Sequence, residues 1–138
     1  MHRVSKNGYT YEIDNQGRTQ RASGTLRLAT AERSPKNQAN AGKPDRLPTD
    51  DGGHYIAVRF NGPRDEFNHF AQNANFNRGA YRALEGRWAK SIKQGKTVKV
   101  SIKSFYLAAS RRPNALVVKS TIGGKVRYNS FRNRHGGK

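Results

Sequence analysis

Hydrophobic and polar residues alternate in several short stretches of the chain, and this period-two pattern predicts β-strands. The predicted strands cover residues 9–13, 19–28, 54–60, 97–107, 115–122 and 125–131. Turn sequences separate the first two strands (Asn-Gln-Gly-Arg at 15–18) and the last two (Gly123-Gly124), so each pair is expected to form a hairpin. The strand at 97–107 carries lysines on its polar face, which predicts a half-buried strand with a cationic outer side.

One stretch has the period of a helix instead. Residues 78–94 place Tyr81, Leu84, Trp88 and Ile92 on one stripe, and Gly95 follows as a stop signal. The stripe indicates that Tyr81 and Trp88 belong to the core and do not stack on nucleic-acid bases. This segment is predicted to be the one main helix.

The remaining segments lack either period. Residues 30–49 are rich in Ser, Pro, Asn and Gly and are predicted to form a long surface loop. Residues 67–76 are crowded with amides and are predicted to be irregular, and residues 132–138 are expected to be a flexible tail. The order of strands, loop, helix and strands predicts an α+β fold with a mostly antiparallel sheet. A chain of 138 residues fits a single domain, 1–138.

The net charge of the chain limits the classes of partner that it is expected to bind. A formal net charge of +18 points to an anionic partner: nucleic acid, an anionic membrane surface or an acidic protein. No apolar run is long enough to span a bilayer, and the first residues lack a signal-peptide core, so membrane insertion is not expected. The absence of cysteine excludes disulfides and thiolate metal sites.

Glu85 is the only carboxylate after Glu66, in a half of the chain that is otherwise basic. A single carboxylate on a surface that binds polyanions would weaken that binding, so its presence requires a local explanation. One reason is an ion pair with Arg78, Arg82 or Arg87 on the same helix. Another is chemistry: phosphodiester hydrolysis uses a base such as His54, and a hard cation that takes oxygen ligands such as those of Asn77 and Glu85.

The spacing of these residues resembles a known family. Asp51-Gly52-Gly53-His54 is followed by Asn68-x-x-x-Gln72 and then by Asn77-x-Gly79, with Glu85 eight residues after Asn77. This series resembles the DNA/RNA non-specific endonucleases, which have a ββα-metal core. It looks most like their branch among bacterial polymorphic and contact-dependent toxins. The similarity runs from about Tyr9 to Phe131, and its specific part is residues 51–88.

The resemblance implies a role for each motif residue. His54 would be the general base, Asn77 the direct ligand of Mg²⁺ (or Mn²⁺), and Glu85 a catalytic residue that holds water around the ion. Asn68 and Gln72 would order the site, with Asn68 counted among the catalytic residues and Asp51 and Gln72 supporting it. If a helix ran unbroken from Asn77 to Glu85, the two residues would lie about 12 Å apart along its axis, too far for both to contact one ion directly. Asn77 is therefore expected at or before the helix start.

A transition-state arginine is expected upstream of the histidine motif, with Arg18 or Arg21 as candidates. Gly52 stands where many relatives have Arg, and Ala71 where Pro is common, so one cationic contribution has to come from elsewhere. His69 is expected to be structural. The residues expected to contact the nucleic-acid backbone are Arg78, Arg82, Lys99, Lys103, Arg111 and Arg112.

The resulting hypothesis is a metal-dependent endonuclease that cuts DNA, with RNA left open as a second substrate. By the resemblance it would be a toxin released from or attached to a larger polypeptide. It would be secreted or delivered into a target bacterial cell, act in the cytoplasm there, and have an acidic immunity protein as partner. The alternative is a non-enzymatic, basic nucleic-acid-binding module, which leaves Glu85 and the amide cluster without a task. A membrane-surface protein is disfavoured because no basic amphipathic helix with a broad apolar face is present.

Overall fold

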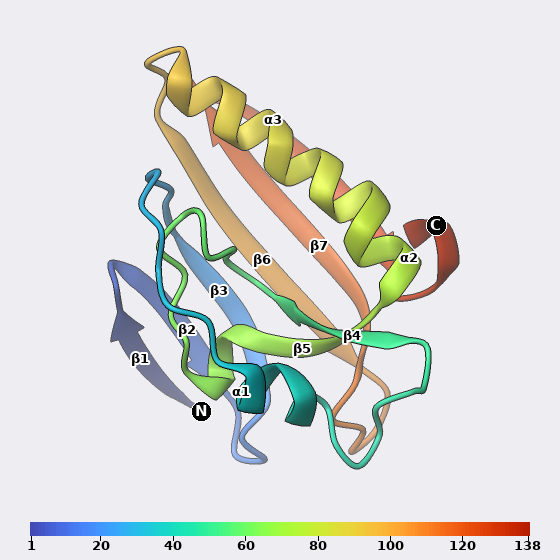
Figure 1. Cartoon of the computed structure of the whole chain (residues 1–138). Helices are drawn as coiled ribbons and strands as arrows, with labels where there is room; N and C mark the ends of the chain where they lie inside the picture. The colour runs from blue at the N-terminus through green and yellow to red at the C-terminus, as the bar shows by residue number, and fades with distance from the viewer.

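The computed structural model describes residues 1–138. Its main layer is a six-stranded antiparallel sheet in the order β1-β2-β3-β6-β7-β8 (Figure 1). The strands are β1 (His2–Lys6), β2 (Tyr9–Ile13), β3 (Thr19–Thr25), β6 (Val98–Tyr106), β7 (Pro113–Ile122) and β8 (Lys125–Arg132). The predicted α+β class and the two predicted hairpins are therefore confirmed, and β1 is an additional edge strand.

A second layer covers one face of this sheet (Figure 1). It contains the hairpin of β4 (Asp50–His54) and β5 (His69–Asn73), and a helix that runs from Ala74 to Lys93 without a break. The helix consists of α2 (Ala74–Phe76), a π-helical turn (Asn77–Tyr81) and α3 (Arg82–Lys93). Three short helices complete the fold: α1 (Pro35–Asn40) and the 3₁₀ helices Glu66–Asn68 and His135–Gly137.

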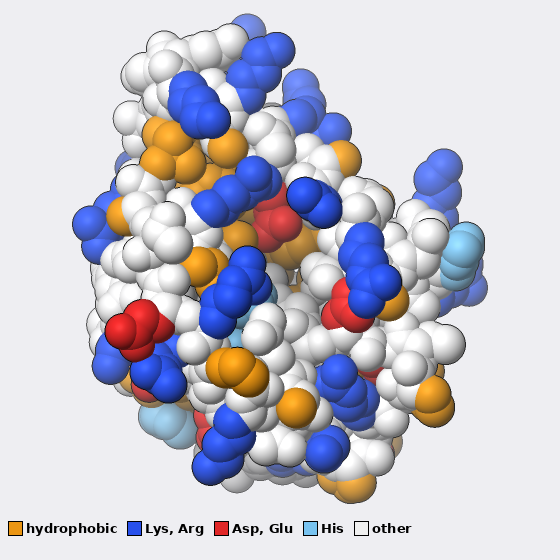
Figure 2. Space-filling view, viewed as in Figure 1, with side chains coloured by type: hydrophobic (Ala, Val, Ile, Leu, Met, Phe, Trp, Pro, Cys, Tyr) orange, Lys and Arg blue, Asp and Glu red, His pale blue; other side chains and the backbone are white.

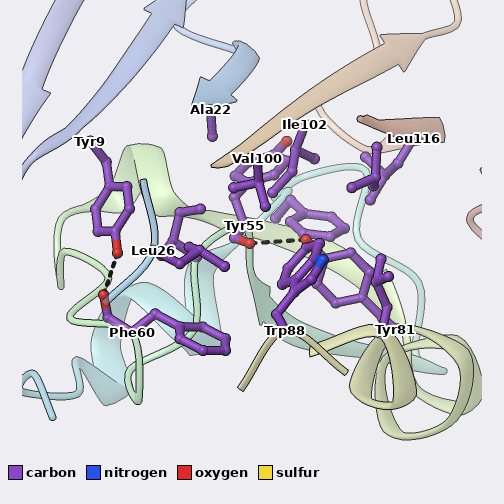
Figure 3. Packing of buried hydrophobic residues seen from close by; sticks show 14 of the residues in the cluster. Tyr9, Ala22, Leu26, Tyr55, Phe60, Tyr81, Trp88, Val100, Ile102 and Leu116 are labelled. Carbon is purple, nitrogen blue, oxygen red and sulfur yellow. Dashed lines mark hydrogen bonds between the residues drawn. The ribbon is translucent and has the colours of Figure 1, made fainter. Parts of the chain in front are cut away.

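The core lies between the two layers (Figure 3). Alternate residues of β6 and β7 face the helix, and the predicted stripe of Tyr81, Leu84 and Trp88 is buried against them. Trp88 donates from Nε1 to Ser120 Oγ at 2.9 Å, and Tyr81 donates its hydroxyl proton to the carbonyl of Tyr55 at 2.9 Å. The two rings are therefore core residues, as the stripe indicated.

Two segments have a secondary structure that differs from the predicted one. Residues 54–60 are not a strand: the chain pairs only up to His54 and then folds into turns closed by bonds such as Phe60 N to Ala57 O. Their alternation came from the burial of Tyr55, Ile56 and Phe60 in a compact loop. Residues 69–73, predicted to be irregular, form β5, whose first four residues are all buried and so show no alternation.

Three further predictions differ from the structure: the start of the main helix, the loop 30–49 and the C-terminal tail. The main helix begins at Ala74, because the Asn73 side chain accepts a hydrogen bond from Phe76 N at 3.1 Å and caps it. Asn77 therefore lies inside the helix and not at or before its start. The long loop 30–49 contains α1, capped by Ser34. At the C-terminus, Asn133 and Gly137 are buried, so the expected tail packs against the body of the protein.

Candidate active site

The β4–β5 hairpin holds the histidine motif. Asp51 pairs with Gln72, and His54 pairs with His69 across the ladder. Glycine is required at the two positions between Asp51 and His54, because neighbouring atoms occupy the space of a side chain. A Cβ at Gly52 would lie 2.0 Å from the carbonyl oxygen of Gln38 in α1, and one at Gly53 would lie 2.0 Å from Gln72 Oε1. The Gly-Gly pair thus lets α1 and Gln72 close around β4.

His54 is a half-buried imidazole without a hydrogen bond to the protein. Its ring packs on that of His69, with centroids 4.6 Å apart, and His69 is fixed by its Nδ1, which lies 2.9 Å from the carbonyl oxygen of Asp65. Burial, together with His69 and Arg33, lowers the pKa of His54 to about 4. His54 is therefore neutral near pH 7 and able to accept a proton.

Asn77 is oriented by Asp51. Its Nδ2 donates to Asp51 Oδ2 at 2.9 Å, which leaves the amide oxygen available to another partner. Arg78 completes this group by binding both carboxylate oxygens of Asp51, at 2.7 and 3.0 Å. Asp51, expected from the sequence to support the site, thus holds the amide of Asn77. Arg78 itself has a side chain that is 71% exposed, so its other face remains open to an anion.

Glu85 makes neither an ion pair nor a hydrogen bond within the protein. The alternative that it pairs with Arg78, Arg82 or Arg87 is therefore wrong. Burial raises the pKa of Glu85 to about 7, against the opposing effect of Arg59 and Arg82. A half-buried carboxylate without a partner is costly in a structural role, which points to a ligand that is not part of the chain.

The π-helical turn brings Asn77 and Glu85 to one face of the helix. In a regular α-helix, two turns take about seven residues, so residues eight apart diverge by about 80°. A π turn encloses one more residue than an α turn, and the interval from Asn77 to Glu85 then spans close to two whole turns. Both side chains consequently line the same pocket.

That pocket has a volume of about 350 Å³ and also receives His54. Basic side chains surround it: Arg33, Arg59, Arg78 and Arg82. Figure 2 shows the same arrangement at the surface, with lysine and arginine side chains gathered around a hollow that contains acidic side chains. Arg33 and Arg59 were not expected from the sequence. Arg33 lies in the polar loop and Arg59 in the segment misread as a strand, and neither position carries a pattern that marks it.

The donor set of this pocket fits a hard cation. One amide oxygen and one unpaired carboxylate are the ligand types that Mg²⁺ takes in proteins, together with several waters. No three His, Cys, Asp or Glu side chains come together anywhere in the chain, so a closed protein cage for a metal is absent. Asn77 and Glu85 are the residues that would hold an ion beside His54.

Asn68 and Gln72 support this site from inside the protein. Asn68 is fully buried, and all its polar capacity is used: it accepts from Tyr11 and Ile56 and donates to Ile56 and Pro63. Since it cannot reach a substrate, it is a structural residue and not a catalytic one. Gln72 is also fully buried, with both amide atoms unpaired beneath Gly53.

Arg18 and Arg112 lie elsewhere. Arg18 binds Asp14 at 2.9 Å and two carbonyl oxygens, and lines a separate pocket with Arg111. Arg112 forms a buried ion pair with Asp50 at 2.7 Å and also donates to the carbonyl of Asn133. Both guanidinium groups are held by the protein itself and lie outside the pocket of His54, so the prediction that they act in the site is wrong.

Lys99, Lys103 and Arg111 are also outside it. Lys99 and Lys103 alternate with the buried Val98, Val100 and Ile102, so they project from the face of the sheet opposite the helix. Arg111 is exposed; its backbone N–H donates to Asp45 Oδ2, and its guanidinium donates to the carbonyl of Gln16. Of the six basic residues expected to contact nucleic acid, only Arg78 and Arg82 line the pocket of His54.

Comparison with known proteins assigns the chain to a family. A family model described as DNA/RNA non-specific endonuclease matches residues 2–124. The chain belongs to the DNA/RNA non-specific endonuclease family. The resemblance in the histidine and asparagine motifs is thereby confirmed, and the activity that goes with the family is hydrolysis of nucleic acid by an endonuclease.

Relatives of this endonuclease include secretion-system proteins. The chain is 35% identical over 125 residues to the type VII secretion system protein EssD of Staphylococcus aureus strain USA300. The match covers 86% of the chain but only 20% of EssD, so the chain spans about a fifth of that protein's length. EssD of strain NCTC 8325 matches to the same extent.

Solved nuclease structures share the fold. NucA from Streptococcus agalactiae with magnesium bound superposes with a TM-score of 0.73 at 18% identity, covering 99% of this chain and 73% of that one. The Sda1 nuclease with bound zinc superposes with a TM-score of 0.71 at 14% identity, covering 94% and 75%. At these identities the likeness concerns the fold, which is that of known metal-binding nucleases.

Proposed function

We propose that this endonuclease is metal-dependent, with His54 as general base and with Asn77 and Glu85 as the residues that hold Mg²⁺ or Mn²⁺. The observation that carries the proposal is the convergence of three groups in one pocket: a neutral imidazole, an oriented amide and a carboxylate without a partner. A nucleic-acid-binding module without catalysis needs none of the three.

His54 takes the proton in this scheme. A water molecule beside its ring attacks the phosphorus and passes a proton to the imidazole. The P–O bond to the leaving oxygen breaks, and that oxygen keeps the electron pair and takes a proton from solvent. The low pKa of His54 keeps the ring unprotonated before the attack. Packing on His69 limits the rotation of the ring, which lines the pocket.

The arginines bind the phosphodiester and the charge that develops on it. Arg33 precedes His54 in the sequence and Arg59 follows it, and both line the pocket. Arg78 and Arg82 reach the pocket from the helix. We assign to Arg33 and Arg59 the cationic contribution that Gly52 cannot provide. When bound, the metal ion supplies Lewis-acid stabilisation of the phosphoryl oxygens. None of these groups reads a base edge, which suits cleavage without sequence preference.

The relatives and the charge support a proposal for the biological setting. We assign DNA as the substrate, with RNA to be tested in parallel, and a role as a toxin domain of a larger secreted polypeptide, as the match to a segment of EssD suggests. Delivered to a bacterial cell, it would act in the cytoplasm. A producing cell then needs an acidic immunity protein that covers the basic pocket. No helix in the chain has the length and apolar character to cross a membrane.

The deciding experiment incubates supercoiled plasmid and, separately, RNA with the protein in Mg²⁺, Mn²⁺ or EDTA. Nicking and degradation are expected with metal and not with EDTA. His54→Ala is expected to lower the rate by about 10² to 10⁴-fold, whereas His2→Ala, at an exposed position on edge strand β1, serves as the matched control. Binding without cleavage under every metal would instead support the non-enzymatic module.

A further inference from the structure

A second basic groove lies on the other side of α3 from the candidate active site. It has a volume of about 580 Å³, and its walls are the C-terminal half of α3 and the β7–β8 hairpin. Trp88 and Ser120 lie at its floor, joined by their hydrogen bond. We call it the α3–β8 groove. None of its lining residues is shared with the pocket of His54.

The groove is lined by cations without counterions. They are Arg87, Lys90, Lys96, Lys125 and Arg127. None of the five forms an ion pair, since the six ion pairs of the protein all lie elsewhere. No carboxylate follows Glu85 in the chain. These like charges repel one another across the groove, and an anionic occupant would relieve that repulsion.

The first residues of strand β8 have an inverted polarity that favours the same conclusion, whereas Phe131, farther along the same face, packs against the core. Residues directly opposite each other in an antiparallel pair share a face. Lys125 is opposite Ile122 and Arg127 is opposite Ser120, so both cations project toward the helix side, where β7 is buried. Val126 and Tyr128 project to the outer side and are 54% and 63% exposed. A strand that only completed the core would have the opposite arrangement.

The dimensions fit a nucleic-acid backbone. The groove follows α3 from Leu84 to Gln94, a length of about 15 Å. Phosphates follow one another at regular intervals along a nucleic-acid strand, so a groove of this length can hold a few successive phosphates. Five cations along such a length match a backbone better than they match the dispersed carboxylates of a protein surface.

We infer that the α3–β8 groove is a second phosphate-backbone site, which holds nucleic acid that extends across α3 from the catalytic pocket. The helix separates the two sites, and its exposed Arg82 and Lys93 continue the positive charge between them. The inference rests on the proposed function, because it concerns how the same substrate is held. It adds a distinct set of residues that bind the substrate without taking part in the chemistry.

The test compares two charge-matched double variants in EDTA, so that no cleavage is read. Lys125→Gln/Arg127→Gln removes two cations from the groove, and Lys99→Gln/Lys119→Gln removes two exposed cations from the outer face of the same sheet. Anisotropy of a labelled duplex is measured between about 50 and 200 mM salt. The groove variant is expected to bind at least tenfold more weakly, and its slope of log K against log salt is expected to be lower by about 2.

The control double variant is expected to keep the slope of the unmodified protein. Equal slopes in the two variants would overturn the inference, and so would a groove variant that binds DNA normally but loses an acidic partner protein. Thermal unfolding of both variants checks that the edge strand is intact. If the groove variant has a reduced slope but the unmodified protein cuts no nucleic acid, only the proposed function is wrong. If the unmodified protein cuts normally but the groove variant has an unchanged slope, only the inference about the groove is wrong.

Discussion

The imidazole rings of His54 and His69 lie 4.6 Å apart, inclined by 51°, on neighbouring strands of the β4–β5 hairpin. His69 is nine-tenths buried, and its Nε2 has no hydrogen-bond partner. Its Nδ1 is held by the carbonyl of Asp65. His69 is therefore held in place against the His54 ring and contributes to the low pKa of His54.

Replacing His69 tests this relationship. His69→Phe keeps a ring beside His54 but removes the charge that His69 can carry, which is one cause of the lowered pKa of His54. The pKa of His54 is expected to rise toward its ordinary value, so protonation at mildly acidic pH inactivates more of the base. Cleavage at pH 5 relative to pH 8 should fall. NMR titration of the His54 ring in metal-free protein measures the pKa directly, and an unchanged value would contradict the assignment.

The raised pKa of Glu85 predicts pH-dependent metal binding. With a pKa of about 7 in the metal-free protein, the carboxyl is mostly protonated at pH 6, and a cation must displace that proton. Metal affinity should therefore rise about tenfold per pH unit below neutrality and level off above it. His54, with its pKa of about 4, does not titrate in this range. Calorimetry with Mn²⁺ measures the affinity, and Glu85→Gln should bind weakly with a flat pH profile.

Two glycines should respond oppositely to alanine. A Cβ at Gly52 would lie 2.0 Å from a backbone oxygen of α1, whereas one at Gly86 in α3 meets nothing within 4 Å. Gly52→Ala is expected to lower the free energy of unfolding by about 1–3 kcal/mol, since α1 must move. Gly86→Ala should raise it by about 0.5–1 kcal/mol through helix propensity. Thermal unfolding of both variants measures the two changes in stability. Similar changes at Gly52 and Gly86 would refute the packing of α1 on β4.

Arg112 and Arg111 are neighbours with different expected roles. The ion pair of Arg112 with Asp50 has a carboxylate that is fully buried, so Arg112→Ala should cost about 3–5 kcal/mol by leaving that charge without a partner. Arg111 is exposed, and Arg111→Ala should cost little more than a surface substitution. Denaturant unfolding of the two variants measures the difference. Equal losses would mean that the Asp50 pair does not hold the chain between β6 and β7 to β4.

Sequence patterns were informative where one face of an element is buried. The stripe of the main helix and the alternation of β6 and β7 gave correct elements, because each has one apolar and one polar side. The same reasoning failed for β5, whose residues are buried on both sides, and for residues 54–60, where burial in a turn imitated a strand. Burial alone does not reveal whether the chain is extended.

Motif spacing led to His54, Asn77 and Glu85, which share a pocket, and to Asp51, which supports Asn77. It did not separate arginines that face the pocket from arginines that hold the fold. Arg18 and Arg112 are engaged by the carboxylates of Asp14 and Asp50, whereas Arg33 lines the pocket of His54 from the loop before α1. The pairing of Arg112 with Asp50 and the approach of Arg33 to His54 are tertiary relationships that no local pattern encodes.

The wide turn at Asn77–Tyr81 also restricts where the helix tolerates a change of length. Loss of one residue within this turn would restore ordinary α-helical winding and leave Asn77 and Glu85 on a shared face, slightly closer together. Loss of one residue between Arg82 and Glu85 would instead swing the carboxylate by about 100°, out of the pocket and toward the buried stripe or solvent. The number of residues between Asn77 and Glu85 can therefore change only within this one turn if both side chains are to stay on the same face of the helix.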